Sequence, residues 1–443
     1  MPRRPKVALF TLGCAKNLVD SERIASILEA AGAQVVHEAR GAAVAIVNTC
    51  GFIDPAKEES IDAVLELADR EGLTRPRTLI VAGCLSQRYG EQLRQELPEV
   101  DAFVGTDPEA TARVALEALG LAHRGACPTR ARRLTPRAWS YLQISQGCDN
   151  RCAYCAIPLI RGPLRSLPAD ELLAEAQFLA GQGVKELNVI AQDITAYGTD
   201  TVGKPLLHVL LRDLCGIEGL EWVRLLYAHP AHFYDKLTGV MAAEQKVCPY
   251  VDLPLQHISN RILKAMGRKV TRARVERLLA RLRDRIPGLT LRTTFITGLP
   301  GETEAEFEEL LEFVREQRFD RVGCFAYSPE DDTPAAAMSD QVPAEVAQER
   351  RDLLMAAQAD IAMDLAQARV GERTRVLIEA RDDAMEDVHP ARSRHEAPDV
   401  DPLIYVTSSR PLQAGDFADV EIVGAEGYDC IAVDLEGTGG REG

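Results

Sequence analysis

Short apolar runs alternate with amphipathic helical stretches as far as about residue 369, and this alternation constrains the fold more than any other feature of the sequence. The first part of the chain holds four such runs, at residues 7–12, 44–47, 78–82 and 102–104. Strands that alternate with helices form a parallel sheet with helices on its faces. We therefore predict a parallel α/β domain over residues 5–121.

A basic stretch follows this domain. Residues 122–137 hold five arginines and no acidic residue, which predicts a solvated linker. The alternative is a basic lip that touches ribosomal RNA. Residues 138–370 then return to the alternating pattern, with strands expected at 184–190, 222–226 and 292–297 and a long closing helix at 344–369. Roughly 230 residues of this kind fit a complete or partial barrel of the TIM type.

The last part of the chain changes character. Residues 372–441 carry short alternating runs at 375–379 and 419–423, separated by turn signals, and this pattern predicts a small all-β barrel. From residue 372 to the end there are 7 lysines and arginines against 17 acids, a net charge of −10 out of −16 for the whole chain. A C-terminal segment with this net negative charge repels phosphate groups and favours a basic partner.

Two features predict a cytoplasmic protein. No apolar run approaches the roughly 18 residues that a membrane-spanning helix requires. The chain starts with a basic segment that leads directly into a predicted strand, without the apolar core and cleavage site of a signal peptide. In a reducing cytosol, eleven cysteines point to metal ligands or catalytic groups rather than to disulfides.

Three cysteines share one short loop. Cys148, Cys152 and Cys155 have the spacing C-x3-C-x2-C, and no fourth cysteine stands nearby. Three thiolates can hold three irons of a cubane cluster and leave the fourth iron open to a ligand. The alternatives are a zinc site and three buried thiols, but structural zinc sites normally close with four ligands in two pairs.

Three further cysteines stand far apart in the sequence. Cys14, Cys50 and Cys84 each follow a predicted strand and precede a predicted helix. In an open parallel sheet all such positions lie at one edge, where ligands bind. These three thiolates can therefore converge on one metal centre, with partly buried spare thiols as the alternative. His229 and His257 are interpreted as hydrogen-bonded core histidines.

The first triad, with Tyr154 before its third cysteine, resembles the signature of the radical S-adenosylmethionine superfamily. The resemblance implies a [4Fe-4S] cluster whose open iron binds S-adenosyl-L-methionine and supplies the electron that generates a 5′-deoxyadenosyl radical. It also implies that Tyr154, Gln192, Asp193 and Arg292 lie where this family contacts the cofactor. Ordinary lining of the barrel is the alternative for each of these side chains.

Both triads together resemble the methylthiotransferases, from about residue 6 to residue 436. The resemblance implies an N-terminal methylthiotransferase domain that holds an auxiliary [4Fe-4S] cluster through Cys14, Cys50 and Cys84. A radical core and a TRAM barrel follow. It further implies an enzyme that uses two S-adenosyl-L-methionine molecules, one as methyl donor and one as radical source. A non-catalytic iron–sulfur electron carrier is the alternative of another class.

The family acts mainly on a tRNA adenosine or on a ribosomal protein. Lys16 and Asn17 after Cys14, together with residues 227–230 and 251–257, resemble the ribosomal-protein branch. The acidic C-terminal barrel independently disfavours tRNA. The resemblance implies methylthiolation of the β-carbon of one aspartate in ribosomal protein S12, with an electron donor of unknown identity, no membrane and no tRNA as partners. The tRNA adenosine methylthiotransferase remains the alternative enzyme.

Overall fold

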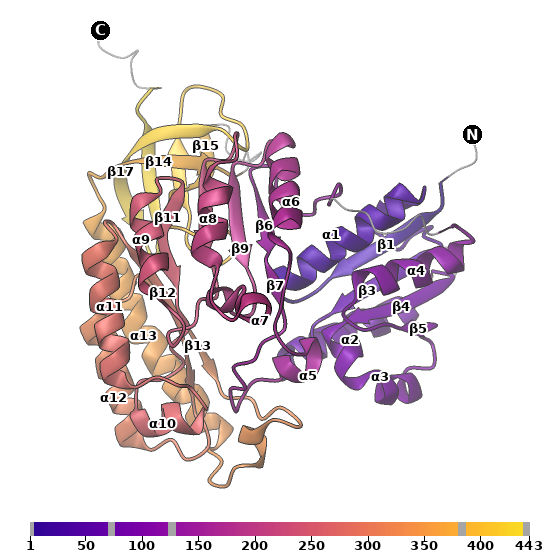
Figure 1. Ribbon diagram of the computed structural model, residues 1–443, viewed down its shortest axis with the longest axis horizontal. Coiled ribbons are helices and arrows are strands. Elements are labelled where there is room, and N and C mark those ends of the chain that lie inside the picture. The colour runs from indigo at the N-terminus through magenta and orange to yellow at the C-terminus, as the bar shows by residue number, and fades with distance from the viewer. Residues whose placement is uncertain (1–3, 70–75, 123–129, 380–386, 437–443) are drawn as a thin grey trace.

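The protein is built of three parts that follow one another along the chain (Figure 1). The computed structural model describes residues 4–69, 76–122, 130–379 and 387–436. In Figure 1 the N-terminal sheet lies to the right of the central sheet, and the C-terminal barrel lies above it. Among the described residues, no helix is both long and apolar enough to cross a membrane.

The N-terminal part is a five-stranded parallel sheet in the order β2-β1-β3-β4-β5. Its strands are β1 Lys6–Thr11, β2 Gln34–Val36, β3 Val44–Thr49, β4 Thr78–Gly83 and β5 Ala102–Phe103. Its helices are α1 Ala15–Ala30, α2 Asp54–Ala68, α3 Cys84–Glu96 and α4 Pro108–Leu119. Side chains of α1 and α4 pack on one face of the sheet, and side chains of α2 pack on the other. The predicted α/β architecture is confirmed.

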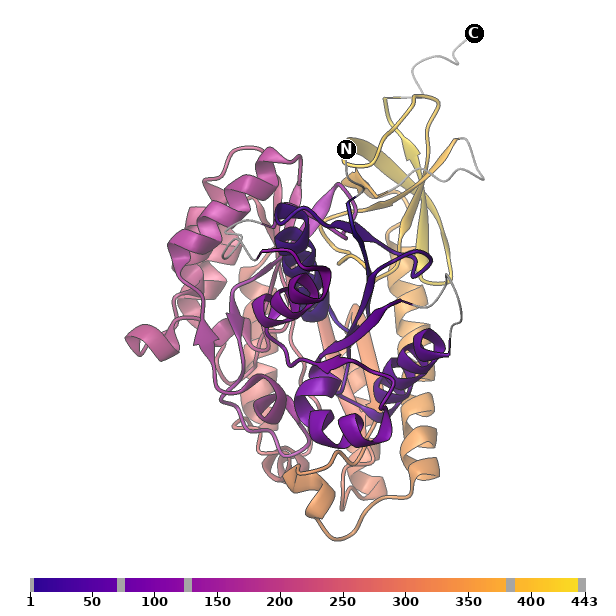
Figure 2. The same ribbon diagram turned by 90° about the vertical axis from the view of Figure 1, so that its right-hand side faces the viewer.

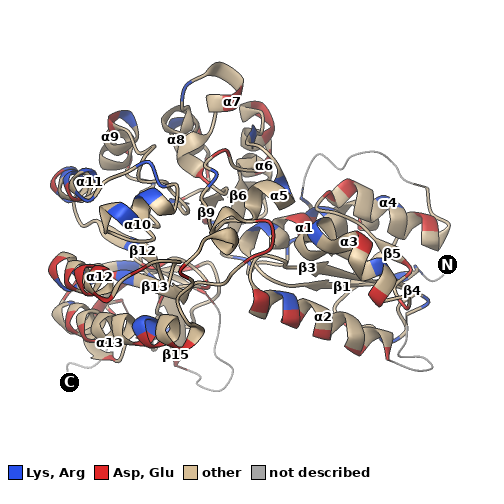
Figure 3. Ribbon diagram, turned by 90° about the horizontal axis from the view of Figure 1, so that it is seen from below, with Lys and Arg blue, Asp and Glu red and all other residues tan. Residues whose placement is uncertain are grey.

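The central part is a six-stranded parallel sheet in the order β13-β12-β11-β10-β9-β6. Its strands are β6 Trp139–Gln143, β9 Glu186–Ile190, β10 Trp222–Leu225, β11 Val247–Asp252, β12 Thr290–Thr297 and β13 Arg321–Ala326. Because the described strands do not close on one another, the partial form of the predicted barrel is the correct one. Figure 3 shows its helices arranged outside the sheet, with acidic and basic residues mixed along α11, α12 and α13.

Helices and short strands connect the strands of the central sheet. The longer helices are α6 Ala169–Gly181, α8 Leu207–Cys215, α9 Asp235–Ala243, α11 Arg272–Arg285, α12 Glu304–Gln317 and α13 Ala344–Ala368. The shorter elements are β7 Ser145–Gln146, α5 Ile157–Arg161, β8 Arg165–Ser166, α7 Thr199–Val202 and α10 Asn260–Ala265. Thr303 and Glu306 form a capping box at the start of α12, which satisfies two backbone donors there.

The C-terminal part is a closed five-stranded barrel in the order β14-β15-β16-β18-β17. Its strands are β14 Arg373–Ile378, β15 Val388–Arg392, β16 Ile404–Thr407, β17 Phe417–Glu426 and β18 Asp429–Asp434. Alternate residues of β17, such as Val420 and Ile422, point into an apolar core. Closure removes the exposed strand edges that a small sheet would otherwise present. The predicted all-β barrel is confirmed.

The basic stretch between the first two parts does not form a solvated linker where the structure describes it. Arg130 is only 2% exposed, and its guanidinium contacts both Glu22 of α1 and Glu175 of α6. It also donates a hydrogen bond to the backbone carbonyl of Tyr141 in β6. The solvated-linker interpretation is therefore wrong for this residue, which joins the N-terminal sheet to the central one. Figure 2 shows the N-terminal part, in indigo and purple, in front of the central part. Residues 123–129 lie outside the described residues.

Buried ion pairs join the C-terminal barrel to the central sheet. Glu186 of β9 binds Arg224 at 2.7 Å and Arg392 of β15 at 2.7 Å. Glu396 of the barrel binds Arg369 at 2.6 Å and lies 3.5 Å from Arg321 of β13. Because breaking a buried pair leaves an uncompensated charge, these contacts fix the barrel against the sheet.

We expect Glu396→Gln to lower the free energy of unfolding by about 3 kcal/mol at pH 7, since it leaves Arg321 without a carboxylate among the described residues and Arg369 with Glu372 alone. Burial alone would raise the pKa of Glu396, but Arg369 and Arg321 outweigh it and lower the pKa to about 2. Because this pKa lies below the ordinary 4.5, the carboxylate stabilises the fold above pH 4.5 and loses that effect as the pH falls towards 2. Urea unfolding at pH 7 and pH 3 measures both effects.

Glu436→Gln is the matched control for this prediction. Glu436 forms an ion pair with Arg410 at 3.2 Å, but its side chain is 67% exposed. Exposed pairs contribute about 0–1 kcal/mol, so this variant should unfold nearly as the parent chain does. A loss for Glu396→Gln that is equally large at pH 3 and pH 7 would contradict the assigned ion pairs.

Candidate metal centres and their surroundings

The structure brings Cys14, Cys50 and Cys84 together at one edge of the N-terminal sheet. Strands β1, β3 and β4 are neighbours, and their ends lead into these three cysteines. A Cβ atom placed on Gly13 would lie 3.0 Å from Cys50 Sγ. The Cys84 thiol is near enough to Cys14 and Cys50 for both to influence its pKa. The convergence predicted from strand ends is therefore present in the fold.

Asn17 and Gly13 fix the positions of the chain segments that carry these cysteines. The Asn17 side chain is fully buried and donates hydrogen bonds to the backbone carbonyls of Leu12, at 2.9 Å, and Thr49, at 3.0 Å. These contacts tie together the chain segments that follow β1 and β3. Gly13 has a φ of +87°, and a Cβ on it would lie 2.7 Å from Cys50 Cβ. Only glycine fits there, because any side chain would push two of the cysteines apart.

Burial makes the inner thiols of this first group poor acids. Burial raises the pKa of Cys50, and it raises the pKa of Cys84 to about 11. Cys14 is exposed, so the group opens to solvent on one side. A metal must displace the thiol protons as it binds, so this edge suits a soft metal centre that can stabilise thiolates.

The second group, Cys148, Cys152 and Cys155, lies on the loop between β7 and α5. Gly147 permits the tight entry to this loop, because its φ is +72° and a Cβ on it would lie 2.0 Å from the Pro163 carbonyl oxygen. The Cys148 amide donates to the Gly162 carbonyl at 3.1 Å. Burial raises the pKa of Cys148 to about 11 and that of Cys155 to about 12.

Each group offers three cysteines. In the described part of the chain, one group of three metal-ligating residues has its ligand atoms all within 4.8 Å of one another, and it contains no cysteine. Structural zinc sites normally close with four ligands, whereas three thiolates can hold three irons of a multi-iron cluster.

The two groups of cysteines lie side by side through helix α5. This helix directly follows Cys155, and its Arg161 Nη2 lies 3.6 Å from Cys84 Sγ and 2.8 Å from Asn17 Oδ1. The same guanidinium binds Asp20 at 2.7 Å. Ala156 and Ile160 pack against Cys84. The sequence did not single out Arg161, and no local pattern around it reveals that it reaches the N-terminal sheet.

Lys16 extends from the first group towards the central sheet. Its side chain is 8% exposed, and its ammonium lies 3.1 Å from the ring centroid of Tyr227, the second residue after β10. Burial lowers the pKa of Lys16 to about 8. The Tyr227 amide donates to Asp252 Oδ2 at 2.9 Å, and Arg292 binds the other oxygen of that carboxylate at 3.0 Å. The sequence marked Lys16 only as part of a motif.

The four predicted cofactor contacts do not share one environment. Tyr154 lies close enough to Cys152 and Cys155 for both to raise its pKa, and Asp193 lines a cavity of about 430 Å³ together with Cys148. Gln192 Oε1 is buried and has no hydrogen-bond partner among the described residues. Arg292, in contrast, contacts Asp252 and lies 3.9 Å from Asp401, beside the C-terminal barrel.

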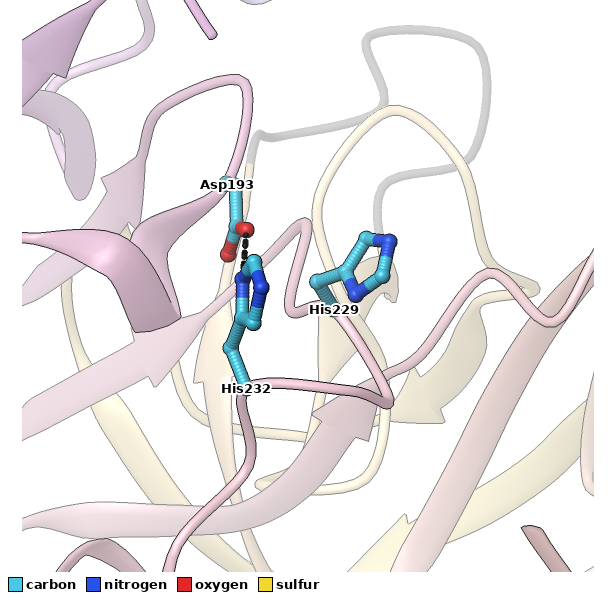
Figure 4. Close-up of side chains that lie close together, drawn as sticks. All are labelled: Asp193, His229 and His232. Atoms are coloured by element: carbon cyan, nitrogen blue, oxygen red, sulfur yellow. Dashed lines mark hydrogen bonds and ion pairs between the residues drawn. The ribbon is translucent and has the colours of Figure 1, made fainter. Parts of the chain in front are cut away.

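Asp193, His229 and His232 form a compact polar group beside this cavity (Figure 4). His232 Nδ1 donates to Asp193 Oδ2 at 2.8 Å, and the two imidazole rings stack with centroids 4.7 Å apart. Burial alone would raise the pKa of Asp193, but the bond from His232 and other contacts lower it. Burial lowers the pKa of His229 to about 3, so this ring is neutral. These ligand types suit a divalent ion, but the carboxylate is already fully hydrogen-bonded.

His229 accepts a hydrogen bond from the Ala231 amide at 3.1 Å, and His257 pairs with Glu302 at 3.0 Å. Both rings are buried. Both side chains are thus buried and hydrogen-bonded, as expected of core histidines.

Several buried polar groups in the central sheet are unsatisfied among the described residues. Gln143 of β6 and Asn188 of β9 each have both amide atoms without a partner, and Ser145 has a free hydroxyl. Leaving such a group unpaired costs roughly 1–3 kcal/mol, and such groups commonly mark a place where a ligand or water binds. The central sheet therefore has donors and acceptors available for a polar cofactor.

Three family models match successive parts of the chain. Residues 6–105 match the model described as Uncharacterized protein family UPF0004, and residues 142–314 match the Radical SAM superfamily. Residues 370–433 match the TRAM domain. Members of the radical SAM superfamily use S-adenosyl-L-methionine and an iron–sulfur cluster.

Curated relatives match nearly the whole chain. A ribosomal protein uS12 methylthiotransferase RimO from Anaeromyxobacter sp. (strain K) is 48% identical over 96% of this chain and 92% of its own length. A protein of the same name from Pelotomaculum thermopropionicum is 46% identical over 96% of this chain and 98% of its own. One from Geobacter sulfurreducens is 43% identical over 97% of this chain and 98% of its own length.

Solved structures share the fold at low sequence identity. The radical S-adenosylmethionine methyltransferase TsrM from Kitasatospora setae is 15% identical with a TM-score of 0.56, over 75% of this chain and 77% of its own. The cobalamin-dependent S-adenosylmethionine radical enzyme OxsB has a TM-score of 0.52 at 14% identity. This match covers 80% of the present chain and 56% of OxsB. Both similarities concern the fold alone.

Proposed function

The chain belongs to the ribosomal protein uS12 methylthiotransferase family of radical S-adenosylmethionine enzymes, and on that basis we propose that it methylthiolates the β-carbon of one aspartate in uS12. The proposal assigns residues 5–121 to a methylthiotransferase domain, residues 122–137 to the segment that connects it, residues 138–370 to a radical core and residues 372–441 to a TRAM domain. Its ribosomal substrate places the reaction in the cytoplasm.

We assign one [4Fe-4S] cluster to each group of cysteines. Cys148, Cys152 and Cys155 would hold the cluster that binds S-adenosyl-L-methionine, and Cys14, Cys50 and Cys84 would hold the auxiliary cluster. One observation supports the fit: the fold brings the three thiols of each group close enough to influence one another's pKa. When bound, the first cluster would supply the electron that generates the radical from S-adenosyl-L-methionine. The auxiliary cluster would supply the sulfur that is transferred.

The observation that carries the proposal is the contact of Arg161 with Cys84. It brings the radical loop, through α5, against the auxiliary group of cysteines. Sulfur transfer requires the reacting carbon to meet both centres, since reaction rates fall steeply when reacting groups are misplaced. An electron carrier usually binds all irons of its cluster with cysteine, whereas each group here offers only three thiols. The missing fourth cysteine therefore favours group transfer over simple electron transport.

The chain's own residues would orient the cofactor and exclude side reactions. Tyr154, beside Cys152, and Asp193, beside Cys148, remain proposed contacts of S-adenosyl-L-methionine. Gln192, with its unpaired buried oxygen, is a third proposed contact. Arg292 is retained as a proposed contact with less structural support, because Asp252 and Asp401 occupy its guanidinium.

The charge of the C-terminal barrel supports a protein substrate. Asp416, Asp419, Glu426 and Glu436 are exposed on it. An acidic surface attracts the lysine- and arginine-rich segments of ribosomal proteins and repels the phosphates of tRNA. We therefore propose uS12, and not tRNA, as the macromolecular partner. An electron donor is also required.

We expect the anaerobically reconstituted chain to add one methylthio group to a basic uS12 peptide that bears the target aspartate, in the presence of reductant and S-adenosyl-L-methionine. The matched sample contains unmodified tRNA instead of the peptide. Mass spectrometry of both measures the result, and we expect modification of the peptide alone.

Either of two results would contradict this proposal. Modification of tRNA alone would show that the charge of the barrel does not select the substrate and would favour the tRNA adenosine methylthiotransferase. Failure to form 5′-deoxyadenosine from S-adenosyl-L-methionine, despite a full iron content, would favour an electron carrier.

A further inference from the structure

Lys16 is a largely buried cation that pairs with no carboxylate of the described residues. Its side chain is 8% exposed, and its ammonium makes no hydrogen bond or ion pair within the described residues. Its one close partner is the ring of Tyr227, at 3.1 Å from the centroid. The ring of Tyr227 carries no negative charge, so an ion pair with a carboxylate of the described residues does not explain this position.

The acidic groups near Lys16 are already engaged by other cations. Asp252 binds Arg292 at 3.0 Å and also accepts from the Tyr227 amide. Asp20 binds Arg161 at 2.7 Å, with both side chains almost fully buried. The nearby guanidiniums thus each have a carboxylate, and Lys16 does not. An added anion would be the natural partner for its ammonium.

The location of Lys16 indicates what this anion is. Lys16 stands two residues after Cys14, which is exposed, so the chain beside Lys16 is open to an incoming group. On its other side Lys16 touches Tyr227 of the central sheet. An anion held by Lys16 would therefore lie at the seam between the auxiliary cysteines and the radical core. This seam is where the proposed reaction must place its substrate.

We propose that Lys16 binds the side-chain carboxylate of the target aspartate. The inference rests on the proposed function and names a residue that selects the substrate. In aspartate the reacting β-carbon is bonded directly to the carboxylate carbon, so an anchored carboxylate holds the reacting carbon one bond away. An asparagine side chain has the same shape but no charge, and Lys16 would discriminate against it. Hydrogen bonds between charged groups are roughly twice as strong as those between neutral groups.

The test measures equilibrium binding to the full-length, cluster-loaded protein without reductant. Two labelled basic peptides of uS12 sequence are used, one with aspartate at the target position and one with asparagine there. Fluorescence anisotropy should show about tenfold or greater preference of the parent chain for the aspartate peptide. In Lys16→Met this preference should fall to near one. Lys16→Arg, which keeps the charge, should retain part of the preference.

Lys57→Met is the matched control. Lys57 also lies near a tyrosine ring, that of Tyr89 at 5.6 Å, but it has its own acidic partners in Asp54 and Glu330. Its removal should leave the ratio of the two peptide affinities unchanged. Thermal unfolding provides a further readout, since loss of an unpaired buried charge should not lower the midpoint for Lys16→Met.

The outcomes separate this inference from the function on which it rests. If the parent chain modifies the aspartate peptide and Lys16→Met keeps the full preference for aspartate, the inference is wrong and the function stands. An unchanged preference with a shifted reduction potential of the bound clusters would equally overturn it, because Lys16 would then serve the clusters. If the parent chain modifies no peptide, the proposed function itself fails.

Discussion

Replacing Cys152 with alanine should abolish the cleavage of S-adenosyl-L-methionine and, with it, every later step. Two remaining thiols cannot hold three irons of a cluster, and the loop between β7 and α5 has no other cysteine to substitute. We expect the rate of 5′-deoxyadenosine formation under reductant to fall by about three orders of magnitude or more. The iron content should fall by about half, because the auxiliary group is intact.

Cys215→Ala is the control for this result. Cys215 ends helix α8 on the outside of the central sheet and belongs to neither group of cysteines. The iron content of the Cys215→Ala variant and its rate of 5′-deoxyadenosine formation should match those of the parent chain. Continued cleavage of S-adenosyl-L-methionine by Cys152→Ala would remove the loop cysteines from the proposed radical site.

Cys84→Ala should separate the two halves of the reaction. Without Cys84 the auxiliary group retains only Cys14 and Cys50, so the proposed second cluster is lost, while the radical loop keeps all three of its cysteines. Arg161 remains held by Asp20 at 2.7 Å, so α5 should stay in place. We expect 5′-deoxyadenosine formation to persist and methylthio transfer to the peptide to fall by about three orders of magnitude or more.

Chromatography of the nucleoside product and mass spectrometry of the peptide measure these two activities in one sample. An enzyme that loses both activities in Cys84→Ala would show that the auxiliary group supports the radical loop itself. Methylthio transfer at the parent rate would show that the sulfur does not come from the N-terminal sheet.

The features that the sequence predicted well are those that local chemistry determines. The alternating runs predicted the parallel sheets, because the period of the apolar residues sets the type of each element. The convergence of Cys14, Cys50 and Cys84 followed from one rule, that the carboxyl ends of parallel strands meet at one edge. The acidic alternating runs after residue 372 predicted a closed β-barrel, and β14–β18 form one.

The features that the sequence did not predict depend on how the three parts pack together. Arg130 looked like one of five solvated arginines, but it is buried because Glu22 and Glu175 come from two different parts of the fold. Arg161 and Lys16 gain their significance only when the radical core meets the N-terminal sheet. No periodicity or spacing in one segment encodes a partner that lies in another part of the fold.

The uneven exposure of the auxiliary cysteines has a consequence for the life of the enzyme in the cell. Cys50 and Cys84 are buried, whereas Cys14 faces solvent. Iron and sulfide delivered by an assembly factor would therefore enter past Cys14, and molecular oxygen would reach the centre by the same route. The open side that would admit the proposed cluster would therefore also be the side from which oxidants attack it.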